Sequence, residues 1–268
     1  MAAVTAAQRP DLLQQAREEL GADPFDRIGD GTDFAQPALY CASLAHFAQA
    51  GSPAGEALAG HSLGELAALV AGGALDAAAG LRLAVTRGRL MEEASEQRPG
   101  GMLAVLGGEE EGVRELAAKF GLTVANDNAP GQAVLSGDAE VLGDARKEAR
   151  AAGFKAIRLP VAGAFHSPLM EPAVEPFRAA LDAVELRAPR VRVISCTAAE
   201  PFDDIRAGLV AALTEPVRWQ ATLKRMRADG ADTFLETGPG DVLTGLVRRT
   251  LDDVEARSLA EPEVVPAG

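Results

Sequence analysis

Cysteine, histidine and positive charge are all scarce in this chain of 268 residues. The two cysteines, Cys41 and Cys196, lie far apart and without metal-ligand spacing, which excludes a disulfide scaffold or a zinc site and favours a reducing compartment. Lysine and arginine number 26 against 39 acidic residues, a net charge of −13, so nucleic acid is not an expected partner. The sequence has no apolar run of about 18 residues and no signal-sequence core at its N-terminus. We therefore expect a cytoplasmic protein without a membrane span.

The chain does have the composition of an ordinary globular protein, with 47% hydrophobic and 24% charged residues. Its most informative segment is Gly60-His61-Ser62-Leu63-Gly64, which follows a short apolar run and opens a helical stretch over residues 65–71. Strand, tight turn and helix are the context of a nucleophile elbow, in which the serine oxygen is lifted clear of a sheet. Both glycines are expected to permit the sharp bend and close approach of neighbouring elements. The N-terminus of the following helix would favour an oxyanion beside Ser62.

Residues 102–160 predict a unit of their own. In order, the pattern indicates a strand at 102–106, a helix at 110–120, strands at 122–125 and 132–136 around a turn at 128–131, a helix at 138–152 and a strand at 156–159. This β-α-β-β-α-β order is ferredoxin-like. Strands that feed helices elsewhere favour a mainly parallel, covered sheet. We expect an α/β fold: a large α/β-hydrolase-like part, residues 1–97 and 163–268, with an inserted ferredoxin-like part, residues 98–162.

A serine nucleophile requires a base, and the chain has only three histidines. His46 falls within an apolar helical stretch, and His61 directly precedes Ser62 in a tight turn, where adjacent side chains usually point apart. His166 stands just before Ser167-Pro168, a predicted helix start. The positive end of a helix favours neutral imidazole, the form that a general base requires. His166 is therefore the expected base.

Arg87 lies on the apolar face of a helix predicted from about residue 76 to 94. An unpaired buried charge is strongly destabilising, so this guanidinium must meet an anion. Two interpretations stay open at this point. Arg87 forms an internal salt bridge, or it holds a substrate carboxylate through a bidentate contact.

The order of these motifs resembles that of malonyl-CoA:acyl carrier protein transacylases. The similar segments are Gly60–Glu65, Thr86-Arg87-Gly88, residues 126–132 (Asn-Asp-Asn-Ala-Pro-Gly-Gln), Ala164-Phe165-His166-Ser167 and Gly238-Pro239-Gly240. The ferredoxin-like part also falls where that family has one. The resemblance covers roughly residues 35–260, and the combination of motifs is specific.

The resemblance implies a ping-pong transfer of a malonyl group from malonyl-CoA to the phosphopantetheine thiol of acyl carrier protein, in fatty acid or polyketide synthesis. Ser62 would attack the thioester with His166 as base, and the backbone N–H of Leu63 would bind the oxyanion. Arg87 would hold the free carboxylate of the malonyl group. A backbone carbonyl, that of Ala212 in this sequence, would orient His166.

The resemblance also implies the substrate-binding residues Met91, Phe165, Asn126 and Asn128. Phe165, directly before His166, is similar to the malonyl-preferring form of related polyketide acyltransferases. Neither a metal nor a permanently bound cofactor is implied. The partners would be a coenzyme A thioester and acyl carrier protein.

One part of the family pattern has no match. Family members open with a strand and a Gly-Gln-Gly-Ser-Gln loop whose first glutamine helps form the oxyanion hole, and nothing in Met1–Phe34 resembles it. Losing one oxyanion donor costs about 10²–10³ in rate, so a reduced activity is expected. A start codon placed too late, a truncated but folded relative and a catalytically weak descendant all stay open. We expect that adding an upstream strand and loop raises both the activity and the melting temperature.

Two other functions stay open. A carboxylesterase or thioesterase of the α/β-hydrolase type shares the elbow, although its histidine normally comes late in the chain; it would hydrolyse malonyl-CoA without an acceptor. A pseudoenzyme would bind acyl carrier protein without turnover. Carrier proteins are typically acidic, so this acidic chain would need a local basic surface. The candidates are Lys224, Arg225, Arg227, Arg248 and Arg249.

Overall fold

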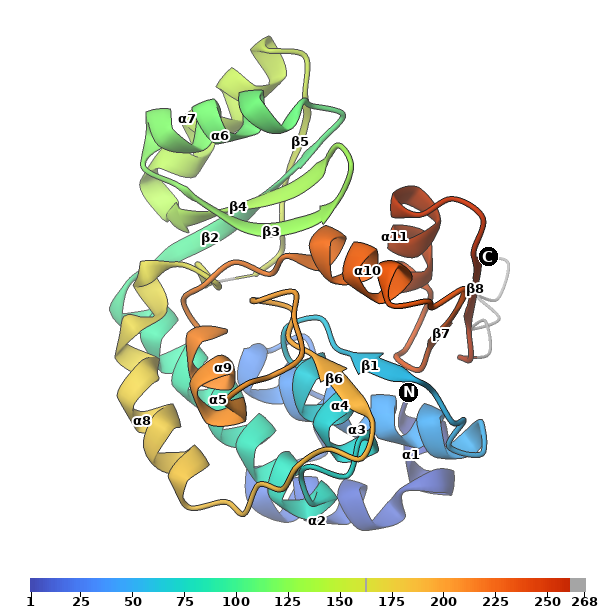
Figure 1. Cartoon of the computed structure of the whole chain (residues 1–268). Helices are drawn as coiled ribbons and strands as arrows, with labels where there is room; N and C mark the ends of the chain where they lie inside the picture. The colour runs from blue at the N-terminus through green and yellow to red at the C-terminus, as the bar shows by residue number, and fades with distance from the viewer. Residues whose placement is uncertain (162, 261–268) are drawn as a thin grey trace, which may run out of the picture.

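The computed structural model, which describes residues 1–161 and 163–260, combines a helix-rich part with a small antiparallel sheet that carries its own two helices (Figure 1). The first helices are α1 (Ala2–Gln8), α2 (Pro10–Leu20), α3 (Thr32–Gln49) and α5 (Ala77–Gln97). Pro10 in the first turn and Gly21 at φ 67° begin and end α2. The Asp76 side chain accepts hydrogen bonds from two backbone N–H groups at the start of α5. These local signals set the ends of α2 and the start of α5, and tertiary packing places α5 against α3, where the site forms.

Four short strands form two separate parallel pairs. β1 (Ala57–Ala59) pairs with β6 (Arg192–Ile194), and β7 (Thr233–Glu236) pairs with β8 (Glu255–Ser258). The chain leaves β1 into α4 (Gly64–Ala71). The remaining helical elements are η1 (Pro168–Met170), α8 (Glu171–Asp182), α9 (Ile205–Ala211), α10 (Trp219–Ala228) and α11 (Val242–Thr250).

The small sheet has the strand order β3-β4-β2-β5, with every neighbouring pair antiparallel. Its elements follow in the order β2 (Gly100–Leu106), α6 (Glu110–Phe120), β3 (Thr123–Ala129), β4 (Gln132–Asp138), α7 (Ala139–Ala151) and β5 (Lys155–Arg158). Both helices cover the same face of this sheet (Figure 1). Leu103 and Leu135 from the strands pack with Leu116 and Leu142 from the helices in one buried cluster.

The prediction of an α/β fold with a β-α-β-β-α-β segment is confirmed, while the division at residues 97–98 and 162–163 stays a proposal. Residue 162 and residues 261–268, which belong to the predicted parts, lie outside the described residues. One local expectation was wrong. β3 continues to Ala129, so Asn126 and Asn128 lie on a strand and the turn is confined to Pro130-Gly131. Backbone pairing with β4 continues there because two register shifts accommodate the irregular stretch.

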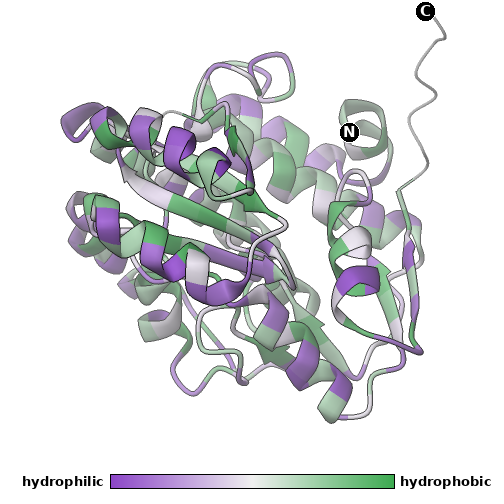
Figure 2. Ribbon diagram, turned by 90° about the horizontal axis from the view of Figure 1, so that it is seen from above, coloured by the Kyte–Doolittle hydropathy of each residue, from purple (hydrophilic) through white to green (hydrophobic). Residues whose placement is uncertain are grey.

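The helices are amphipathic around a common core. Figure 2 shows hydrophilic and hydrophobic residues side by side on the outer helices, as expected when a helix buries one face. The large buried cluster unites α3, α4, α5, α8 and the segment just after α9, and its members include Tyr40, Leu66, Leu83, Phe177 and Leu213. This packing fixes α5 relative to the segment that carries Ser62.

Candidate active site

Ser62 lies in a strained turn between β1 and α4. Its φ is 52°, in the left-handed region that residues with a side chain rarely adopt. The turn also brings Gly60 against the first residue of α4, because a Cβ on Gly60 would lie 1.9 Å from the backbone carbon of Gly64. Only glycine fits such an approach, so Gly60 makes the elbow possible.

Gly64 does not share this role. A Cβ on Gly64 would meet no atom within 4 Å, so the expectation that both glycines serve close approach holds only for Gly60. Gly64 and Glu65 donate their backbone N–H groups to the carbonyls of His61 and Ser62, at 3.0 and 3.1 Å. The N–H of Leu63 has no hydrogen-bond acceptor among the described residues, and it is therefore available at the start of α4.

His166 contacts the serine directly. Its Nε2 lies 2.9 Å from Ser62 Oγ, and its Nδ1 lies 3.2 Å from the carbonyl oxygen of Glu215. A carbonyl can only accept, so Nδ1 donates and Nε2 carries the lone pair that faces the serine hydroxyl. His166 also has a positive φ of 56°, which shows that the loop before η1 is bent to deliver the ring.

Burial keeps this histidine neutral. His166 is 3% exposed, and burial, together with the positive charge of Arg87 and the nearby His61, lowers its pKa to about 3. The carbonyls of Glu215 and Ala212 oppose this shift. The imidazole is therefore unprotonated at neutral pH, as a general base must be.

The carbonyl that accepts the hydrogen bond from His166 Nδ1 is that of Glu215, three residues after the expected Ala212. The Ala212 carbonyl also acts on the ring, since it too raises the pKa of His166, so its part in orienting His166 stays a prediction. The kind of acceptor, a backbone carbonyl, is the one expected. The segment is held by the small sheet, because Val217 exchanges backbone hydrogen bonds with Ala125 and Asp127 of β3 at 2.8 and 2.9 Å.

Arg87 meets the same serine from α5. It is 4% exposed, its Nη2 donates to Ser62 Oγ at 3.1 Å, and its Nη1 donates to Gln36 Oε1 at 2.7 Å. None of the ion pairs among the described residues includes Arg87. The first of the two interpretations left open by the sequence, an internal salt bridge, is therefore not observed. Burial lowers the pKa of Arg87 to about 10, which leaves it charged at neutral pH.

Gln36 on α3 is a site residue that sequence reasoning missed. It is 5% exposed, and its Nε2 donates to Thr32 Oγ1 at 3.0 Å and to the sulfur of Met91 at 3.3 Å. A Cβ on Gly88 would lie 2.8 Å from Thr32 O, so the close crossing of α3 and α5 brings Gln36 to Arg87. A glutamine within an otherwise apolar helical run was the available signal.

The other expected substrate-binding residues differ in how directly they contact Ser62, Arg87, His166 and their neighbours. Met91 is buried on α5, one helical turn beyond Arg87, and contacts Gln36. Asn128 Oδ1 lies 2.8 Å from His61 Nε2, which turns His61 away from the serine. Asn126 is 5% exposed on β3, and Phe165 is partly buried next to His166.

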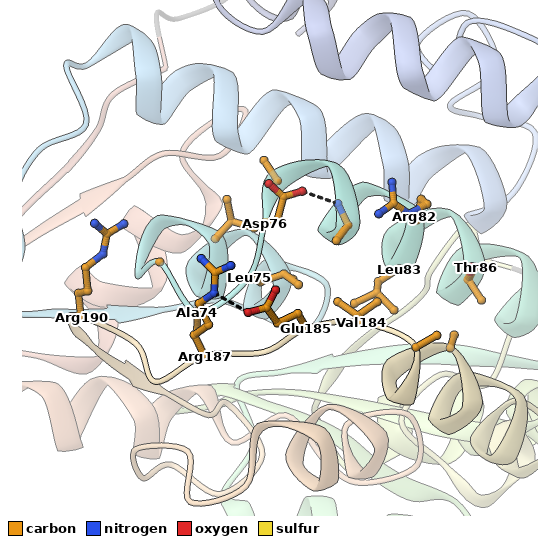
Figure 3. A pocket seen from close by; sticks show the side chains of 16 residues that line it. Ala74, Leu75, Asp76, Arg82, Leu83, Thr86, Val184, Glu185, Arg187 and Arg190 are labelled. Atoms are coloured by element: carbon orange, nitrogen blue, oxygen red, sulfur yellow. Dashed lines mark hydrogen bonds and ion pairs between the residues drawn. The ribbon is translucent and has the colours of Figure 1, made fainter.

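Two cavities flank α4. A groove of about 820 Å³ is lined by both β1 and β7 and reaches the elbow at Gly60, His61 and Leu63. A second cavity of about 750 Å³ lies at the other end of α4, where Arg82, Arg187 and Arg190 surround it (Figure 3). Its lining includes none of Ser62, Arg87 and His166.

Within residues 1–161 and 163–260, no helix is both long and apolar enough to cross a bilayer. In the same residues no three histidine, cysteine or acidic side chains are grouped to bind a metal ion.

A serine in a strained strand-to-helix turn, bonded to a neutral histidine that a carbonyl orients, is typical of hydrolases and acyltransferases that work through an acyl-serine. Comparison with known proteins agrees with this class. The acyl transferase domain family matches residues 11–267. The chain belongs to this family and is an acyltransferase.

Individual relatives refine the comparison. The malonyl CoA-acyl carrier protein transacylase of Bacillus subtilis is 38% identical over 281 residues, which cover 98% of this chain and 88% of that protein. The polyketide biosynthesis protein ThaF of Burkholderia thailandensis is 40% identical over 270 residues, but the match spans 94% of this chain and only 23% of ThaF. Among solved structures, the complex of a type II polyketide-synthase acyl carrier protein with its malonyl-transacylase superimposes with a TM-score of 0.89 at 32% identity, covering 98% of this chain and 92% of that one.

Proposed function

We propose that this chain transfers a malonyl group from malonyl-CoA to the phosphopantetheine thiol of acyl carrier protein through an acyl-enzyme on Ser62. The observation that carries the proposal is the position of Ser62 Oγ, 2.9 Å from His166 Nε2 and 3.1 Å from Arg87 Nη2. A nucleophile thus adjoins both a neutral base and a buried cation. The names of the relatives, malonyl CoA-acyl carrier protein transacylases of which one belongs to polyketide biosynthesis, support the same substrate.

In the first half-reaction, Ser62 Oγ attacks the thioester carbonyl and its proton passes to His166 Nε2. The imidazolium is stabilised by the carbonyl of Glu215 at Nδ1. The developing oxyanion lies at the N-terminal end of α4, where the Leu63 N–H can donate to it. Collapse of the intermediate breaks the carbon–sulfur bond, and the coenzyme A thiolate takes the proton from His166.

Arg87 selects the acyl group. Its guanidinium donates to Ser62 and Gln36 and presents its charge beside the nucleophile, so an acyl group with a free carboxylate forms a charge-assisted pair there. An acetyl group has no anion to place against this buried cation. Met91, Phe165, Asn126 and Asn128 complete the proposed substrate site.

In the second half-reaction the carrier thiol replaces coenzyme A. Its proton passes to His166 as sulfur attacks the malonyl-serine ester, and Ser62 leaves with that proton. The proposed setting is the cytoplasm. Among the candidate basic residues for the acidic carrier, Arg225 is engaged with Asp229 and Glu200, whereas Arg249 is exposed near the end of α11.

Intact-protein mass spectrometry after incubation with malonyl-CoA tests the proposal. We expect a malonyl adduct on the parent protein, no adduct on Ser62→Ala, little adduct with acetyl-CoA, and loss of the parent adduct to added holo acyl carrier protein. Release of free malonate in the absence of a carrier would instead indicate a thioesterase. Carrier binding that Ser62→Ala leaves unchanged, without any adduct on folded parent protein, would indicate a pseudoenzyme.

A further inference from the structure

A buried carboxyl group behind the nucleophile has no role in the mechanism above. Glu65 lies in the first turn of α4, three residues after Ser62, and is 0% exposed. Its Oε1 accepts a hydrogen bond from the backbone N–H of Cys196 at 2.7 Å. Its Oε2 has no hydrogen-bond partner among the described residues. A buried carboxylate that is only half satisfied is unfavourable, so its protonation state depends strongly on nearby charge.

Arg87 is the cation that acts on this carboxyl. The guanidinium makes its hydrogen bonds to two neutral side chains, Gln36 and Ser62. Both residues contact Ser62, since Arg87 Nη2 donates to its Oγ at 3.1 Å and the backbone N–H of Glu65 donates to its carbonyl oxygen at 3.1 Å. The charge of Arg87 lowers the pKa of Glu65, although less than the hydrogen bond from Cys196 does. Glu65 is thus the negative charge within the protein that partly compensates the buried arginine.

We propose that Glu65 is the resident counter-charge of Arg87, and that it takes up one proton from solvent when the carboxylate of an acyl substrate binds to Arg87. This inference rests on the proposed function of the site. Two carboxylates close to one guanidinium repel each other, and the like charge favours protonation of the more deeply buried one. The incoming carboxylate also neutralises the charge of Arg87, which is one of the contributions that favour the ionised form of Glu65.

The balance of charges around Glu65 puts this exchange near neutral pH. Burial raises the pKa of Glu65 to about 7, opposed first by the hydrogen bond from Cys196, then by the neighbouring Ser195, both after β6, and least by the charge of Arg87 from α5. Burial also keeps the Cys196 thiol protonated by raising its pKa. Glu65 is therefore largely ionised at pH 8 in the free protein and already protonated at pH 5.5.

The exchange would couple substrate selection to a proton. Binding of an anionic acyl group would consume up to about one proton at pH 8 and almost none at pH 5.5. An uncharged acyl group would leave Glu65 unchanged at either pH. Glu65 then acts as a positioning residue that sets how strongly Arg87 attracts the carboxylate.

Isothermal titration calorimetry on the full-length Ser62→Ala protein tests this inference. Malonyl-CoA and acetyl-CoA are titrated at pH 8 and pH 5.5, each in two buffers of different ionisation enthalpy, which gives the number of protons taken up on binding. Subtracting the number for acetyl-CoA from that for malonyl-CoA removes the protons exchanged by the shared coenzyme A part. We expect malonyl-CoA to take up about one proton more than acetyl-CoA at pH 8 and no more at pH 5.5. Adding Glu65→Gln, which keeps an acceptor for the Cys196 N–H, should abolish the difference while binding persists.

Equal proton numbers for the two ligands at pH 8 would overturn the inference, as would an uptake that survives Glu65→Gln. Should the double variant fail to fold, the loss of uptake between pH 8 and pH 5.5 in Ser62→Ala alone decides the matter. The malonyl adduct on the parent protein separates this inference from the proposed function. An adduct together with proton-neutral binding refutes only the role of Glu65, whereas no adduct and no binding refute both.

Discussion

The two ends of α4 carry similar residues in opposite surroundings. At the N-terminal end, Arg87 from α5 is buried against neutral partners and Glu65 is fully buried. At the C-terminal end, about 12 Å away along eight residues of helix, Arg82 of the same helix α5 lines an open cavity and Arg187 pairs with the exposed Glu185 (Figure 3). The charges are alike, but burial shifts the pKa of Glu65 and of Arg87 towards the neutral form of each, whereas the hydrogen-bonded Glu185 and Arg187 shift each other's pKa towards the charged form. Burial, more than residue type, separates the site from an ordinary surface.

Gly60 and Gly73, near the two ends of α4, give the largest expected contrast, which is in the free energy of unfolding. Gly60→Ala would drive a Cβ to within 1.9 Å of the backbone of Gly64, and we expect a loss of about 4 kcal/mol or more in the free energy of unfolding, or failure to fold. Gly73→Ala has a positive φ of 76° but meets only the flexible Arg190 side chain, so about 1–2 kcal/mol is expected. Chemical denaturation of both variants measures the difference. Equal losses would mean that the elbow is not the tighter of the two turns.

The two arginines of α5 give the next contrast, in activity. Arg87→Ala removes the cation beside Ser62, and we expect kcat/KM for malonyl-CoA to fall about 10²–10³-fold, the cost of one charge-assisted contact in a buried site. Arg82→Ala should change it less than twofold, because Arg82 is exposed at the far cavity. A steady-state assay with malonyl-CoA and acetyl-CoA checks this. A similar loss for the two substrates in Arg87→Ala would contradict selection by charge.

Glu65 and Glu185 give a contrast in how the free energy of unfolding depends on pH. The folded-state pKa of Glu65 is raised to about 7 from 4.5, so its contribution to stability is fully present below pH 4.5 and is lost as the pH rises to 7. The stability lost over this range amounts to about 3 kcal/mol, at 1.36 kcal/mol per pKa unit. Glu65→Gln should remove this loss, so the free energy of unfolding of the variant relative to the parent should grow by about 3 kcal/mol from pH 4.5 to 7. Glu185→Gln, at an exposed position, should leave the parent profile unchanged. The profiles are compared with one another because the lowered pKa of His166 adds an opposite slope to all of them. Urea titrations across this range test both variants, and a Glu65→Gln profile parallel to that of the parent would rule out the raised pKa.

The smallest expected effect is that of Gln36→Ala. This change removes the acceptor that holds Arg87 Nη1 at 2.7 Å, so the guanidinium loses orientation but keeps its charge. We expect a fall of about tenfold in kcat/KM for malonyl-CoA, which corresponds to the loss of one hydrogen bond between a neutral amide and a charged guanidinium. Gln14→Ala, on the exposed face of α2, is the control. No effect in Gln36→Ala would show that packing alone orients Arg87.

Local patterns allowed the small sheet and the elbow to be predicted, because each depends on residues close in sequence. Alternating apolar residues and turn signals marked the β-α-β-β-α-β segment, and the glycines marked the turn at Ser62. The hydrogen bond from His166 to the Glu215 carbonyl escaped prediction because it joins segments that are distant in sequence. No local pattern says which carbonyl near the end of α9 lies within reach of the ring.

The sequence by itself determined the nucleophile turn, its candidate base and the family to which they point, since short motifs encode backbone conformation and chemical type directly. Only the tertiary structure decided what Arg87 meets, that Gln36 holds it, and that Glu65 is buried without a complete set of hydrogen bonds. Those properties arise where α3, α4, α5 and the segment after β6 converge. Burial and the electrostatic field at such a point are sums over many distant residues, and no local pattern carries them.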